Sequence, residues 1–191
     1  MTPINWSKIM GYIRFTILPP NEDWQEILSD VYCDLDKSFK ITQNKQNYTL
    51  DKCSSKLLYA NSHHIFYKNE SFGTILMESG FVKLEKFYIA YSQKYDNITV
   101  FTGHPECFDL YDIQIYNKGN LIRKSNWVGQ ELYNNASDIL KPLYSNFLNT
   151  EIGEKTDYEE LPHLLPLLYH FGWTQDDLNQ NNWKLITTNL H

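Results

Sequence analysis

The chain has 191 residues, of which 42% are hydrophobic and 15% aromatic, and its formal net charge is −6. This length and apolar content are typical of one folded domain, with a core that needs neither disulfides nor a structural metal. The negative balance and the lack of a basic stripe disfavour nucleic acid or an anionic membrane as partner, because both bind through lysine and arginine. A basic protein partner fits the charge better.

The first third of the chain predicts strands and one helix. Residues 12–17 alternate apolar with polar or amphipathic side chains, which indicates a half-buried strand. Asn21 is placed to cap a helix whose apolar face runs over residues 24–31. Residues 39–42 and 57–67 have the composition of further strands.

The middle of the chain predicts a helix, a strand and a hairpin. Apolar and aromatic side chains recur at helical spacing over residues 82–95, and residues 98–102 are typical of a strand. Residues 110–124 predict a β-hairpin with a three-residue connection, Asn117-Lys118-Gly119, in which Gly119 takes the left-handed conformation.

Helical patterns dominate the region after Trp127. We expect helices over residues 137–147 and 161–168, with Gly172 as the stop of the second one. Thr174 and Asp177 resemble a capping box for a brief last helix.

A strand over residues 183–187 is expected to close the fold. Together these elements predict a single α+β domain over residues 1–191, with a mainly antiparallel sheet, packed helices and a helical C-terminal segment.

The cysteines and the N-terminus indicate a reducing, cytoplasmic location. Cys33, Cys53 and Cys107 are widely spaced and form no CxxC pattern, so we interpret them as free thiols. The N-terminal residues lack the features of a signal peptide, and no run approaches the roughly 20 apolar residues that a membrane span needs.

The stretch from His104 to Cys107 is the strongest candidate for chemistry. His104 and Glu106 match half of the zinc deaminase signature, but the Pro-Cys-x-x-Cys half is missing. A zinc site from His104, Cys107 and either His63 or His64, or a Cys107 nucleophile activated by His104, are the alternatives. None of these patterns is complete, so we predict no catalytic residue, no metal and no cofactor.

An acidic segment near the C-terminus is the predicted partner-binding surface. Its carboxylates would attract a basic partner while nearby aromatic rings anchor it, although such charge runs are more often solvated loops. The residues assigned to this surface are Glu151, Glu154, Asp157, Tyr158, Glu159, Glu160, Trp173, Asp176 and Asp177.

The hairpin over residues 111–124, which reads YDIQIYNKGNLIRK, resembles one found in small bacterial immunity-type proteins. The resemblance implies a cytosolic α+β protein that binds and blocks a toxin, such as a basic nuclease, without catalysis of its own. The function predicted from the sequence is therefore inhibition of a partner toxin. The alternatives are a small metal- or Cys/His-dependent hydrolase and a general interaction or regulatory module.

Overall fold

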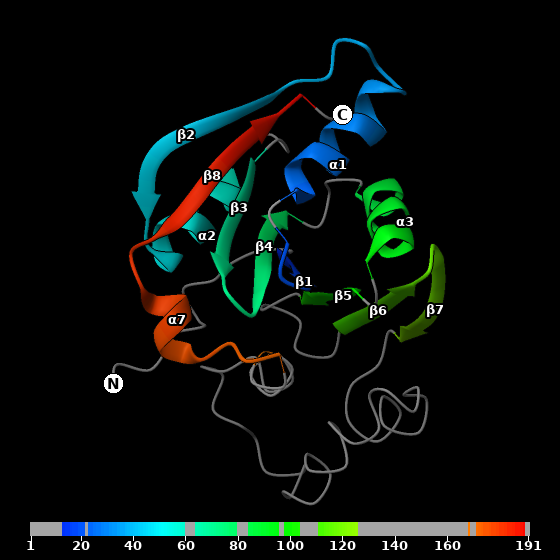
Figure 1. Cartoon of the computed structure of the whole chain (residues 1–191). Coiled ribbons are helices and arrows are strands. Elements are labelled where there is room, and N and C mark those ends of the chain that lie inside the picture. The colour runs from blue at the N-terminus through cyan, green and yellow to red at the C-terminus, as the bar shows by residue number, and fades with distance from the viewer. Residues whose placement is uncertain are drawn as a thin grey trace, which may run out of the picture.

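One antiparallel sheet organises the part of the chain that the structure describes. The computed structural model describes residues 13–21, 23–59, 64–79, 84–95, 98–103, 111–125, 168 and 171–189. The strands lie across the sheet in the order β2 (Ile41–Tyr48), β8 (Trp183–Thr188), β3 (His64–Glu70), β4 (Gly73–Ser79), β1 (Ile13–Leu18), β5 (Ile98–Gly103), β6 (Tyr111–Asn117) and β7 (Asn120–Ser125) (Figure 1). All neighbours pair antiparallel, which confirms the expected α+β class with a mainly antiparallel sheet.

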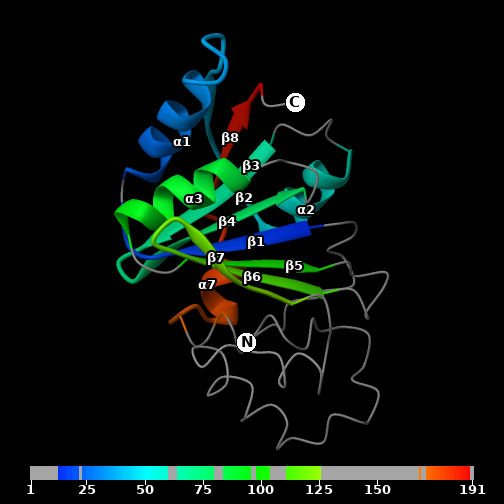
Figure 2. The same cartoon turned by 90° about the vertical axis from the view of Figure 1, so that its right-hand side faces the viewer.

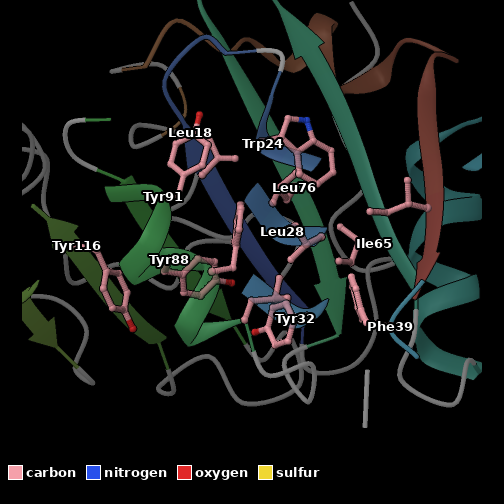
Figure 3. Close-up of a cluster of buried hydrophobic side chains, with 13 residues drawn as sticks. Leu18, Trp24, Leu28, Tyr32, Phe39, Ile65, Leu76, Tyr88, Tyr91 and Tyr116 are labelled. Atoms are coloured by element: carbon pink, nitrogen blue, oxygen red, sulfur yellow. The ribbon is translucent and has the colours of Figure 1, made fainter. Parts of the chain in front are cut away.

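Two helices, α1 (Trp24–Cys33) and α3 (Glu85–Lys94), cover one face of the sheet (Figure 2). Trp24, Leu28 and Tyr32 recur every fourth residue of α1, so they form the buried side of that helix. Figure 3 shows them gathered with residues of α3 and of the sheet. The core cluster on this face is Leu18, Trp24, Leu28, Tyr32, Phe39, Ile65, Leu76, Leu84, Phe87, Tyr88, Tyr91, Tyr116 and Ile186.

The start of α1 is fastened to the end of α3. One carboxylate oxygen of Asp23 accepts hydrogen bonds from Lys94 Nζ at 2.6 Å and from Tyr95 Oη at 2.7 Å. Asp23 is also the residue that precedes the helix, so the expectation that Asn21 caps it is wrong. The Asn21 side chain instead accepts a hydrogen bond from the Asp23 backbone N–H at 2.9 Å, which shapes the turn into the helix.

The helix α2 (Leu50–Tyr59) was not predicted, and residues 57–59 were assigned wrongly to a strand. Leu50, Cys53 and Leu57 are buried at helical spacing, and β3 begins only at His64. β4 was also missed. All seven of its residues are buried, so it lacks the polar–apolar alternation that identifies a half-exposed strand.

The short helix α7 (Gln175–Asn179) is held to the sheet by Lys68 and Trp183. Lys68 Nζ donates to the backbone oxygen of Asp177, and Trp183 Nε1 donates to the backbone oxygen of Leu178 at 2.9 Å. The capping box of Thr174 and Asp177 is confirmed, since each residue bonds the backbone N–H of the other.

Two glycines take the left-handed backbone, which the sequence predicted for Gly119. Gly172 has a φ of 85° just before α7, although the helix expected to end there lies outside the described residues except for Leu168. In the β6–β7 hairpin, Lys118 and Gly119 have φ values of 48° and 80°, which define a two-residue type I′ turn. The three-residue connection expected for this hairpin is therefore wrong.

None of the helices in the described ranges is long and apolar enough to cross a membrane. The helix expected over residues 137–147 lies outside the described residues.

Candidate functional site

The exposed side of α1 carries a line of carboxylates, which we name the acidic ridge. It consists of Glu26, Asp30 and Asp34, all of them exposed and spaced four residues apart. Residues four apart stack on one side of a helix, and Asp34 keeps helical backbone angles although it is the C-cap. The ridge therefore runs along the whole length of α1, on the side opposite Trp24 and Leu28.

The C-terminal part of the acidic ridge, Asp30 and Asp34, makes α1 less stable than neutral side chains would, whereas the dipole favours Glu26 in the first turn. Like charges four residues apart cost about 0.2–0.5 kcal/mol per pair. Asp30 and Asp34 also lie at the negative end of the helix dipole, and the last turn of α1 has no basic residue. The ion pairs found in the described residues are Arg14–Glu78, Lys68–Glu70 and Lys94–Asp23, so none of them neutralises the ridge.

An exposed apolar side chain and further carboxylates surround the C-terminal end of the ridge. Leu35 follows it directly and is 55% exposed, which is high for a large apolar side chain. The exposed Asp36 side chain accepts a hydrogen bond from the Ser38 backbone N–H at 2.8 Å, and bonds from Ser38 lower its pKa. Glu85, exposed at the start of α3, is near enough for its charge to act on Tyr32 of α1. This end of α1 thus combines an apolar side chain with several negative charges.

The predicted C-terminal surface is described only in small part. Glu151, Glu154, Asp157, Tyr158, Glu159 and Glu160 lie outside the described residues, as do His104 and Cys107. Asp176 is exposed in the first turn of α7. The Asp177 carboxylate is engaged in the capping box, where it accepts from the backbone N–H of Thr174 at 2.9 Å.

Trp173 does not serve as an exposed anchor in this structure. Its exposed fraction is 0%, and its ring meets the ring of Phe72 edge-on with the centroids 5.0 Å apart. An anchor must offer its ring to the partner. The assignment of Trp173 to a partner-binding surface is therefore corrected: the residue belongs to the core.

A buried polar cluster lies between α3 and the sheet. Glu78 of β4 is opposite Arg14 of β1 in the strand register, and its Oε1 lies 3.5 Å from Arg14 Nη1. Tyr88 of α3 donates to the same oxygen at 2.7 Å, and the Tyr88 hydroxyl is 3.1 Å from Thr16 Oγ1. The Glu78 side chain is completely buried.

Burial dominates the electrostatics of this cluster. Removal from water raises the pKa of Glu78 to about 7, although Arg14 and the Tyr88 hydroxyl oppose the shift. Burial and the charge of Glu78 also raise the pKa of Tyr88 well above its ordinary value. Ionisable groups with shifted pKa values are common at active sites, but they also occur in buried structural networks.

The Glu78 cluster is not part of the open pocket that the described residues form. That pocket has a volume of about 620 Å³ and lies where β1 and the β3–β4 hairpin end, lined by Pro20, Asn21, Asn69, Glu70, Ser71 and Thr74. Since a catalytic carboxyl must reach its substrate, we interpret the cluster as a structural element and the pocket as separate from it.

The described residues contain no group of three or more potential metal ligands. Of the cysteines, Cys53 is buried, and burial raises the pKa of its thiol, which disfavours the reactive thiolate. Cys33 is a partly buried free thiol whose Sγ lies 3.7 Å from Ser29 Oγ.

Sequence reasoning missed both the acidic ridge and the Glu78 cluster. The ridge had a visible signal, because Glu26, Asp30 and Asp34 alternate with apolar residues at helical spacing. Glu78 directly follows the apolar residues 75–77, a position where a charge is often buried with its strand. No family model, curated protein or solved structure matches the chain.

Proposed function

We propose that this chain is a non-catalytic, cytoplasmic protein of the immunity type, which neutralises a toxin by covering the toxin's active surface. The observation that carries the proposal is the acidic ridge of α1 with the exposed Leu35 at its end. Its partner would be a basic protein, such as a nuclease whose positive surface normally binds phosphates.

The energetics of α1 support a role in binding for the ridge. Its carboxylates repel one another, and Asp30 and Asp34 stand at the unfavourable end of the helix dipole, so these two do not stabilise the helix that carries them. A basic partner would remove this repulsion on binding. Side chains that lower the stability of their own element are expected at functional or strained sites.

The proposed mechanism divides the work between charge and apolar contact. The net charge of −6 and the ridge would steer a basic partner toward α1 and raise the association rate. Leu35 would fill a shallow apolar site on the partner and slow dissociation, together with the residues around it. The acidic residues 151–160 and Asp176 would add to the same negative field.

The first experiment is co-purification with the product of the gene immediately upstream, followed by measurement of the association rate at low and high salt. We expect a stable complex whose association slows as the ionic strength rises, because exposed charges are screened beyond about 10 Å at 0.1 M salt. Toxin activity should fall in proportion to the complex formed. A toxin that remains fully active in the complex would refute inhibition by occlusion.

Charge-reversal variants then locate the surface. Glu26→Lys combined with Asp30→Lys should slow association at least tenfold at low salt, because two charges near the contact change sign. The matched control compares Asp30→Lys alone with Asp51→Lys, which makes the same change in net charge on α2, away from α1. Equal effects of these two single variants would show that net charge alone matters and that the ridge is not the docking surface.

A further inference from the structure

We propose that Glu78, Tyr88, Thr16 and Arg14 form a proton-controlled latch that holds α3 on the sheet. The latch is closed when the Glu78 carboxyl carries a proton and weakened when it loses that proton. This inference does not depend on the proposed function.

The geometry gives the latch its closed state. The Tyr88 hydroxyl of α3 lies between Thr16 of β1 and Glu78 of β4. A second polar contact of α3 is at the β6–β7 turn, where Ser92 Oγ accepts from the Gly119 backbone N–H at 3.0 Å. The Glu78 oxygen that accepts from Tyr88 is 3.5 Å from Arg14 Nη1, which is long for a strong ion pair. One buried carboxyl thus joins a helix to two strands.

The second oxygen of Glu78 makes the ionised state unfavourable. Oε2 is buried, and no described residue donates a hydrogen bond to it. A carboxylate that is removed from water needs hydrogen-bond donors for both oxygens. A protonated carboxyl is neutral, so burying it costs less free energy. Once Glu78 ionises, opening α3 lets water reach the unpaired oxygen, so the open state gains relative to the closed one.

The groups that face Glu78 from the surrounding elements do not cancel this effect. β1 supplies Arg14, α3 supplies Tyr88, and α1 supplies Tyr32, on which the charge of Glu78 acts. On β3 the residue opposite Glu78 is the apolar Ile65. Arg14 is the single cation among them, and burial still keeps the pKa of Glu78 near 7.

Hydrogen exchange at residues 84–95 of the full chain tests the latch at pH 5.5 and pH 8.0, after correction for intrinsic exchange rates. With a pKa of 4.5 when exposed and about 7 when enclosed, Glu78 should increase the opening of α3 about 25-fold between these two pH values. In Glu78→Gln, which keeps the size but cannot ionise, we expect the change to fall below about threefold. Glu26→Gln, the same substitution on the surface of α1, should keep the full change.

Two results would overturn the proposal. One is an equal pH dependence of α3 in the original chain and in Glu78→Gln. The other is an equal increase of exchange in α2, on the other face of the sheet, because that would show a general loosening of the fold instead of a latch on α3.

Discussion

Replacing Tyr88 with phenylalanine tests how strongly α3 depends on the buried hydroxyl of this residue. The substitution keeps the ring, which packs against Tyr116 with centroids 5.5 Å apart. It removes the hydroxyl, which is the hydrogen-bond partner of both Glu78 and Thr16. Each buried polar group that loses a partner costs about 1–3 kcal/mol. We expect the free energy of unfolding to fall by about 2–4 kcal/mol at pH 8.0, where Glu78 is ionised, and by about half as much at pH 5.5.

The original chain should itself lose stability over the same pH range. Because the pKa of Glu78 is higher in the folded chain than in the unfolded one, the folded chain binds this proton more tightly. The contribution is complete below pH 4.5 and is lost as the pH rises through 7, which amounts to about 2 kcal/mol between pH 5.5 and 8.0.

Urea unfolding followed by circular dichroism measures both effects, and a double-mutant cycle of Tyr88→Phe with Glu78→Gln isolates the pair. We expect a coupling energy of about 1.5–3 kcal/mol at pH 8.0 and a smaller one at pH 5.5. Tyr95→Phe is the matched control, since its hydroxyl donates to Asp23, whose pKa is lowered and which stays ionised at both pH values. A coupling energy below about 0.5 kcal/mol at pH 8.0 would refute this account of the cluster.

Three smaller perturbations probe the rest of the fold through the same unfolding measurement. Leu28→Ala should cost about 3–5 kcal/mol because Leu28 is fully buried, whereas Leu35→Ala, at 55% exposure, should cost under about 0.5 kcal/mol; similar values would contradict the assigned burial. Gly119→Ala should cost about 1–2 kcal/mol, since φ is 80° and the added carbon would lie 2.6 Å from Gln93 Cγ; an unchanged midpoint would argue against the type I′ turn. Thr174→Ala should remove the cap of α7 for about 1 kcal/mol, and Thr174→Ser should restore most of it.

The elements that the sequence predicted well are those with one periodic signal. Residues 12–17 alternate apolar with polar or amphipathic side chains, which predicted a strand correctly, and the capping box of Thr174 specifies the start of α7 by itself. The expectation that this strand is half-buried is wrong, because every residue of β1 except Arg14 is buried. β4 was missed because it is buried on both faces and so lacks the polar–apolar alternation of a half-exposed strand. α2 does carry apolar residues at helical spacing, Leu50, Cys53 and Leu57, but the prediction assigned residues 57–59 to a strand instead.

The surface that we propose for binding differs from the one predicted from the sequence, for a different reason. The sequence pattern favoured residues 151–160 because acidic residues are dense there. The acidic ridge has only three carboxylates, and they form one surface only after α1 has folded. Trp173 has the chemistry of an anchor, but its contact with Phe72 is a tertiary one that sequence spacing does not predict. The same holds for Glu78, whose partners come from β1 and α3.

The place of β8 in the sheet sets the order in which the chain assembles during synthesis. β8 is the last of the described strands along the chain, yet it lies between β3 and β2, and within the described residues β2 pairs with β8 alone (Figure 1). During synthesis, more than a hundred further residues must therefore be added before residues 41–48 can pair with β8. Strand pairing between residues so distant along the chain slows folding. The polar, lysine-bearing β2 is suited to that delay, because such a strand pairs poorly with the edge strands of other molecules.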